Sequence, residues 1–219
     1  MNSSRSIPTS FRSSKSVLRR WRALALASLV AVAADAGAGL YPPAAPPGSA
    51  FVRVFNATSQ AKISAQVGDK ALPDTPAFDA SAYQFVQPGD YPAKLAGSQQ
   101  NLHLAGSRCY TAALTADGVH VFDQDCFNSQ LKALVSVFNL VDGTTLSLRT
   151  ADGATAVVDN VAANSAGHRE VNAVKIDLAI YNGNTKLADA KPVALERGRA
   201  YSLFVTGTAA QPVPIWIVN

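Results

Sequence analysis

The side chains that most often carry catalysis are few in this 219-residue chain. Its three histidines are His103, His120 and His168. Acyl transfer by a serine requires a base, normally His, that a carboxylate holds in place. The run Gly89-Asp90-Tyr91 has tyrosine where a Gly-Asp-Ser nucleophile motif would have serine, and no Gly-x-Ser-x-Gly turn occurs. We therefore predict no catalytic residues and a protein that is not itself an enzyme.

Metal ligation is also poorly supported by the sequence. The histidines share no common spacing, and the two cysteines are better explained as a disulfide pair than as metal ligands. Asp123 and Asp125 lie two residues apart and so share one face of a strand, which could suit Ca²⁺. Calcium sites normally use six to eight oxygen ligands, so a solvated strand edge is the preferred interpretation. We predict no metal and no cofactor.

The cysteines flank a turn signal. If Asp117-Gly118 forms a two-residue hairpin turn, Ala116 pairs with Val119, and counting outward places Cys109 opposite Cys126. This is a non-hydrogen-bonded position, where Cα atoms lie about 4.5 Å apart, within the range of a disulfide. The alternative is two unconnected thiols. We predict a Cys109–Cys126 disulfide.

The segments around these residues read as short strands. Leu102 and Leu104 flank His103, and Leu146 and Leu148 alternate with polar residues. Such a period of two is typical of strands with one buried face. Turn signals recur at short spacing, and no window of a dozen residues shows a helical period. We therefore predict an all-β fold, either a sandwich or a barrel.

Two motifs occur twice, in the same order. Val52-Arg53-Val54-Phe55-Asn56 returns as Val135-Ser136-Val137-Phe138-Asn139, and residues 104–111 match residues 195–202 in apolar, turn, basic and aromatic positions. A polar break at residues 128–130 separates the copies. We predict two tandem antiparallel β-sandwich domains, at 51–127 and 132–219, joined by a short linker.

The N-terminal region differs in composition. Arg19-Arg20-Trp21-Arg22 precedes the apolar run 23–33, which predicts a secretory signal peptide over residues 1–36 and an exported protein. The alternative is a membrane anchor, for which the run is short. Four prolines within residues 42–47 predict an extended Pro-rich leader over 37–50.

The net charge of +4 depends on that N-terminal segment. Six of the 19 basic residues and one of the 15 acidic residues lie in 1–36, so 13 basic and 14 acidic groups remain beyond it. The remaining chain is nearly neutral and has no basic tract, so we predict no nucleic-acid partner and no stable membrane insertion after cleavage.

The run Gly48–Ala57 resembles the start of the mature domain in the AlgF family of alginate O-acetylation proteins. Pro88-Gly89-Asp90-Tyr91, Leu148–Gly153 and Tyr201–Gly207 resemble that family too, and the likeness extends from about Leu40 to the C-terminus. The resemblance implies a periplasmic protein of two β-sandwiches that is required for acetylating an exopolysaccharide.

The resemblance also implies partners, namely periplasmic enzymes of the SGNH-hydrolase type and a membrane-bound acyl transferase. It brings no catalytic residues, and no residues that bind a partner can be named. We predict a non-catalytic adaptor for alginate acetylation. Three alternatives stay open. The first is a carbohydrate-binding module with Tyr41, Tyr83, Trp216 and outward-facing Phe residues as its aromatic platform. The others are an enzyme with an unrecognised mechanism and a role in acetylating cellulose.

Overall fold

Strands make up the regular structure of the described part of the chain. The computed structural model describes residues 45–218, and within them no helix is present, so none is available to cross a membrane. The signal peptide and residues 37–44 of the Pro-rich leader, with Tyr41, lie outside the described residues. The first eight strands are β1 (Ala50–Asn56), β2 (Lys62–Val67), β3 (Lys70–Pro76), β4 (Gln84–Val86), β5 (Gly89–Leu95), β6 (Ser98–Leu104), β7 (Arg108–Thr115) and β8 (Gly118–Asp125).

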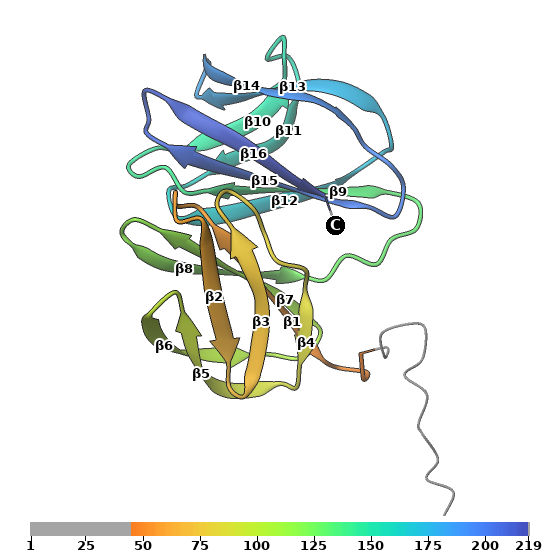
Figure 1. Cartoon of the computed structure of the whole chain (residues 1–219). Coiled ribbons are helices and arrows are strands. Elements are labelled where there is room, and N and C mark those ends of the chain that lie inside the picture. The colour runs from red at the N-terminus through yellow and green to blue at the C-terminus, as the bar shows by residue number, and fades with distance from the viewer. Residues whose placement is uncertain (1–44, 219) are drawn as a thin grey trace, which may run out of the picture. The chain divides into compact units, whose positions relative to one another are not determined.

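The second eight strands repeat this arrangement. They are β9 (Ala133–Asn139), β10 (Leu146–Thr150), β11 (Ala156–Val161), β12 (Ser165–Val171), β13 (Lys175–Asn182), β14 (Thr185–Ala194), β15 (Ala200–Gly207) and β16 (Pro212–Val218). The sixteen strands form four sheets of four (Figure 1), in the orders β4-β1-β7-β8, β3-β2-β5-β6, β12-β9-β15-β16 and β11-β10-β13-β14. No sheet mixes strands of the two halves, and the predicted class of two tandem β-sandwiches is confirmed.

The two motifs that recur in the sequence also lie side by side in each sandwich. Each sandwich contains one parallel pair among its antiparallel ones, β1 with β7 and β9 with β15. Val52 pairs with Tyr110 in the first sandwich, and Val135 pairs with Tyr201 in the second. The parallel register brings the first motif of each copy beside the second motif, and alternation alone could not have revealed this pairing.

The polar members of the repeat stabilise turns. Asn56 and Asn139 are fully buried, and each amide donates to two backbone carbonyls. The Tyr110 hydroxyl accepts a hydrogen bond from the amide five residues earlier (2.8 Å), and Tyr201 does the same (3.0 Å). Because an unpaired buried polar group costs free energy, these bonds explain why the two copies share Asn and Tyr. The repeat therefore indicates architecture rather than chemistry.

Each sandwich has its own apolar core between its two sheets. In β1, Val52 and Val54 point into the first core, while in β9 Val135 and Val137 point into the second. Strand side chains alternate between faces, so the intervening residues point out of each sandwich.

A third apolar cluster lies where those intervening residues meet. It contains Phe55 from β1, Phe138 from β9 and Phe204 from β15. Phe204 stacks on Phe55 with centroids 3.7 Å apart and on Phe138 at 4.5 Å. The cluster joins the sheet β4-β1-β7-β8 to the sheet β12-β9-β15-β16, which explains why β1 and β9 are buried on both faces. Aromatic pairs typically contribute about 0.5–1.5 kcal/mol each beyond area burial.

Candidate functional site

The hairpin β7–β8 carries both cysteines. The structure joins Cys109 and Cys126 by a disulfide with a Cα–Cα distance of 5.1 Å. The register that led to this pair was wrong, because Cys109 lies opposite Gln124 and not opposite Cys126. The turn residues are Ala116 and Asp117, and Gly118, at φ +138°, already pairs with Thr115. The hairpin therefore closes one residue earlier than predicted, and the bridge runs diagonally to a residue just beyond β8.

The acidic pair on this hairpin contacts a neighbouring cation. Arg108 donates to Asp123 at 2.6 Å and also to Asp125, which lies opposite it in the register. These carboxylates raise the pKa of the Arg108 guanidinium, chiefly through the hydrogen bond to Asp123. Asp123 and Asp125 thus share a strand face, as expected, but both are paired with Arg108. No cluster of three potential metal ligands occurs among residues 45–218.

The histidines lie on three different strands. His103 on β6 is 2.8 Å from Asp90 on the exposed face of its sheet, His120 lies on β8 opposite Ala113, and His168 lies on β12 opposite Ser136. The His103–Asp90 pair has the base and the orienting carboxylate of a catalytic triad. Within the described part of the chain, however, no hydroxyl is hydrogen-bonded to any histidine. The arrangement provides no activated nucleophile.

A buried arginine connects the two sandwiches. Arg53 is 0% exposed, and its Nε donates to Thr111 Oγ1 of the first sandwich at 3.0 Å. Its Nη2 donates to Ser202 Oγ of the second sandwich at 2.8 Å, and the guanidinium lies 4.6 Å from the centre of the Tyr83 ring. Burial lowers the pKa of Arg53, because the interior disfavours its charged form. A buried, hydrogen-bonded charge tolerates few alternative arrangements, so it fixes how these two sheets pack.

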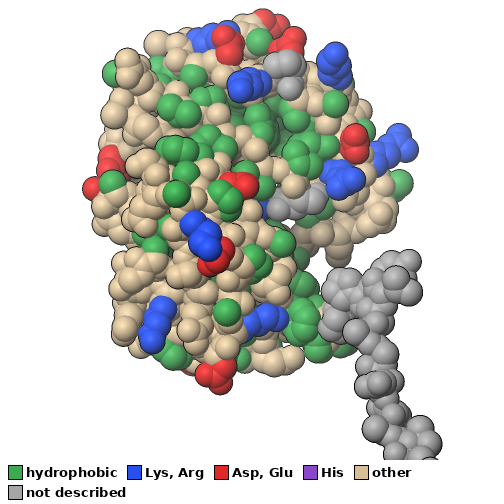
Figure 2. Space-filling view, in the orientation of Figure 1, with side chains coloured by type: hydrophobic (Ala, Val, Ile, Leu, Met, Phe, Trp, Pro, Cys, Tyr) green, Lys and Arg blue, Asp and Glu red, His purple; other side chains and the backbone are tan. Residues whose placement is uncertain are grey.

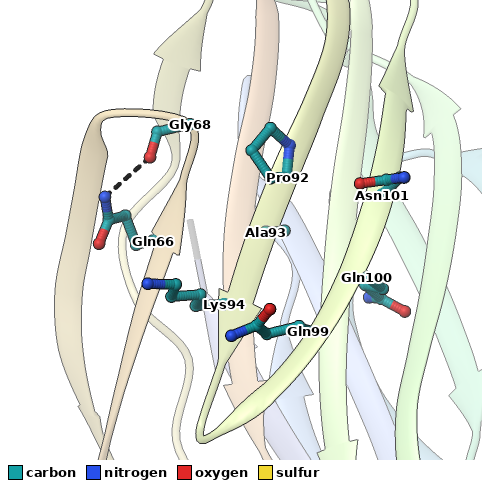
Figure 3. Close-up of a pocket in the computed structure, with 8 residues that line it drawn as sticks. All are labelled: Gln66, Gly68, Pro92, Ala93, Lys94, Gln99, Gln100 and Asn101. Carbon is teal, nitrogen blue, oxygen red and sulfur yellow. Dashed lines mark hydrogen bonds between the residues drawn. The ribbon is translucent and has the colours of Figure 1, made fainter.

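The outer face of sheet β3-β2-β5-β6 is polar and slightly hollowed (Figure 3). Lys94 and Gln99 lie opposite each other on β5 and β6, and Gln66 on β2 donates to the carbonyl of Gly68 at 2.8 Å. A hollow of about 360 Å³ is lined by these side chains together with Asn101. Its lining contains no aromatic ring and no carboxylate, so it offers hydrogen bonds and one positive charge to a partner.

The outer face of sheet β11-β10-β13-β14 carries a different polar group. The Ser147 hydroxyl donates to Asp159 at 2.5 Å, and Arg149 donates to the same carboxylate at 3.3 Å. The Ser147 bond and the neighbouring Arg149 charge lower the pKa of Asp159. Arg149 also lies 5.8 Å from the centre of the Tyr181 ring. The two outer faces therefore differ in chemistry.

Two members of the predicted aromatic platform, Tyr83 and Trp216, line one hollow in the described part of the chain. Tyr83 lies beneath Arg53, 3.2 Å from the Thr111 hydroxyl. Trp216 is half-buried on β16 and lines a groove that also contains Phe78 and Lys191. Sequence patterning did not single out Phe78 or Lys191, because both lie at positions that no period or motif marks.

Charge is dispersed over the surface. Figure 2 shows acidic and basic side chains interspersed on the face seen, with apolar side chains between them. Several charges are paired, either across strands, as in Lys62–Asp74 at 2.7 Å, or within one strand, as in Lys186–Asp189 at 2.5 Å. Such dispersed charge is unlike the continuous basic surface that phosphate backbones require.

Known proteins resemble this chain over most of its length. The family model described as "Alginate O-acetyl transferase AlgF" matches residues 22–202. A Pseudomonas syringae pv. tomato protein named "Alginate biosynthesis protein AlgF" is 45% identical, covering 89% of this chain and 86% of its own. The Pseudomonas aeruginosa protein of the same name is 39% identical, covering 90% and 93%. The solved C-terminal domain of that organism's AlgF is 47% identical and covers 41% of this chain and 99% of its own, with a TM-score of 0.38.

Proposed function

Because the chain belongs to the AlgF family of alginate biosynthesis and O-acetylation, we propose that it is a non-catalytic adaptor of the acetylation machinery in the periplasm. Its partners in this proposal are SGNH-type acetylation enzymes and a membrane-bound acyl transferase. The resemblance seen in the sequence is thereby confirmed at the level of the family. The adaptor role, the partners and the location are the proposal.

The observation that carries the proposal is the connection between the sandwiches. The stacked rings of Phe55, Phe204 and Phe138, together with buried Arg53, hold the inner sheets against each other. The outer sheets are consequently left as two faces of different chemistry, one rich in amides and one bearing the Ser147–Asp159–Arg149 group. Two faces of unlike chemistry suit a protein that holds two partners at once.

The arrangement of the histidines supports the non-catalytic part of the proposal. An acyl-transfer site needs a nucleophile, a base and an orienting group in mutual contact. His103 has only Asp90 as a described side-chain partner, and both side chains are largely exposed, at 75% and 82%. An exposed pair without a hydroxyl cannot generate a serine nucleophile.

The location rests on two features. Residues 1–36 have the composition of a secretory signal, and the Cys109–Cys126 bridge suits an oxidising compartment. We propose domain limits of 51–127 and 132–219 for the exported protein, with residues 37–50 as its leader.

Deletion and complementation test the proposal. Deleting the gene should abolish polymer acetylation and leave polymer synthesis intact, because an adaptor acts only on the modification step. Restoring the chain with His103, His120 and His168 all changed to Gln should restore acetylation. Loss of acetylation with that folded triple variant would contradict the non-catalytic reading.

Copurification tests the adaptor itself. The tagged protein should retain acetylation enzymes, and changes on the outer faces, such as Gln99→Glu with Asn101→Asp, or Arg149→Glu, should release them. The exposed residue Leu131, between β8 and β9, offers a control, Leu131→Ser. Retention of no acetylation enzyme by the unchanged protein would refute the adaptor.

A further inference from the structure

The first sandwich has an edge strand whose outer backbone groups are unpaired. β6 ends the sheet β3-β2-β5-β6, and β5 is its one neighbour there. The amide of Gly68 on the β2–β3 turn donates to the Pro92 carbonyl at 2.9 Å, so Pro92 directs its carbonyl away from β6. Pro92 lies opposite Asn101, and backbone groups alternate along a strand, so Gln99, Asn101 and His103 direct their N–H and C=O groups outward. No strand within residues 45–218 pairs with that side of β6.

The second sandwich closes the corresponding edge. Its hairpin β13–β14 corresponds to β5–β6, and the indole Nε1 of Trp216 on β16 donates to the Ala190 carbonyl on β14. Trp216 also packs on the core of that sandwich, so its side chain connects one sheet to the edge of the other. The pairing of β13 with β14 is further interrupted by two register shifts. Irregular and covered edges of this kind disfavour the addition of another strand.

The first sandwich has valine in place of this tryptophan. Leu203 and Ala112 occupy equivalent positions, because each pairs with the third residue of the first repeated motif. Trp216 lies opposite Leu203, and Val121 lies opposite Ala112. Val121 is 39% exposed, whereas Ala112 is buried. The edge that Trp216 covers in the second copy is therefore open in the first.

A buried donor without an acceptor lies on the inner side of β6. Gln100 alternates with Leu102 and Leu104, so its side chain points to the same side of the strand as two residues of the core. Gln100 Nε2 is buried and has no hydrogen-bond partner among residues 45–218. Because an unpaired buried donor costs free energy, this amide favours a ligand that brings an acceptor to the edge.

Other edge strands carry features that oppose pairing. β16 contains Pro212 and Pro214, β3 contains Pro73, and β4 is only three residues long. Proline has no N–H to donate and blocks an added strand. β8 bears the carboxylates of Asp123 and Asp125. β6 contains no proline, no lysine and no acidic residue, so its backbone is accessible to an extended chain.

A row of outward N–H and C=O groups is complementary to one kind of ligand, the backbone of another strand. We propose that an extended segment of an acetylation enzyme adds to β6 as a fifth strand of this sheet, paired with the backbone of Gln99, Asn101 and His103. Its inward side chains cover the edge left open by Val121 and bring an acceptor to Gln100 Nε2, so the segment alternates apolar or amide residues with polar ones. This inference rests on the proposed function, which supplies the partner.

Binding of a purified SGNH-type acetylation enzyme to the full-length protein, measured by interferometry, tests the inference. Asn101→Pro removes one outward N–H and places a ring at the edge, so it should weaken binding about tenfold or more. Asn101→Ala keeps the backbone groups and should bind within about threefold of the unchanged protein, since most contacts around a binding centre are near neutral. This pair of variants separates recognition of the backbone from recognition of the side chain.

Val121→Trp tests the same edge from the other sheet. It introduces the ring that closes the second copy and should also weaken binding about tenfold. Val213→Trp makes the same change at an exposed valine of β16 and should leave binding unchanged. Because Val121→Trp alters only an exposed side chain, it decides the question if Asn101→Pro fails to fold.

The outcomes separate this inference from the proposed function. Unchanged binding by folded Asn101→Pro or by Val121→Trp would overturn the inference, as would equal losses in Asn101→Ala and Asn101→Pro. A dimer of the unchanged protein that Asn101→Pro dissociates, measured by light scattering, would place a second copy at β6 and also overturn it. No binding by the unchanged protein would refute the adaptor and this inference together, whereas binding retained by the variants would refute this inference alone.

Discussion

Removing the ring of Phe204 should show whether the third apolar cluster joins the sandwiches in solution. Phe204 is 0% exposed and stacks on a ring from each sandwich, at 3.7 Å on Phe55 and 4.5 Å on Phe138. Replacing a buried Phe by Ala costs about 3–5 kcal/mol, through lost transfer free energy and the cavity left behind. The equivalent residue of the first copy is Ala113, which pairs with Phe55 as Phe204 pairs with Phe138.

The free energy of unfolding of Phe204→Ala is measured in urea, and its thermal midpoint is measured by calorimetry. A loss of about 3–5 kcal/mol corresponds to a midpoint lower by about 6–20 °C for a chain of this size. Because the Phe204 ring contacts a ring of each sandwich, its removal weakens the contact between the sandwiches. The variant should therefore unfold in two separated transitions, one for each sandwich.

Val213→Ala provides the control, since Val213 is 50% exposed on the neighbouring strand β16. Its loss of stability should stay within about 0.5 kcal/mol. A loss below about 1 kcal/mol for Phe204→Ala, or a single transition as sharp as that of the unchanged protein, would refute the reasoning.

Three further predictions concern the rest of the fold. Protein purified from the periplasm should contain no titratable thiol, and changing both Cys109 and Cys126 to Ala should cost at most about 3 kcal/mol, because the closed loop is short; two titrated thiols would exclude the bridge. Tyr110→Phe and Tyr201→Phe should each destabilise the protein by about 1 kcal/mol in urea, since each leaves a backbone amide without its hydroxyl acceptor; a neutral effect at both sites would contradict this. The folded-state pKa of Asp159 lies below its ordinary value of 3.8, so Asp159 stabilises the fold above that pH. This stabilisation is lost as the pH falls through the folded-state pKa. Asp159→Asn should therefore lose less stability in acid than the unchanged protein, and an unchanged acid profile would contradict the shift.

The fold class was accessible from the sequence because it depends on local periodicity. A period of two, frequent turn residues and two echoed motifs predicted two tandem β-sandwiches, and the sixteen strands confirm that class. The family was also accessible from the sequence, because the order and spacing of its short motifs can be read along the chain. The disulfide was predicted from an incorrect register. The hairpin closes one residue earlier than predicted, and this shift changes every opposed pair along it.

What the sequence could not supply is whatever depends on contacts between distant segments. Arg53, set between Val52 and Val54, has the pattern of a solvent-facing residue, yet it lies fully buried against Ser202, 149 residues away. Phe78 and Lys191 are more than a hundred residues apart and line one groove only because two sandwiches meet there. Alternation determines which side of a strand a residue occupies, but only the packing of sheets decides whether that side faces water, a second domain or a ligand.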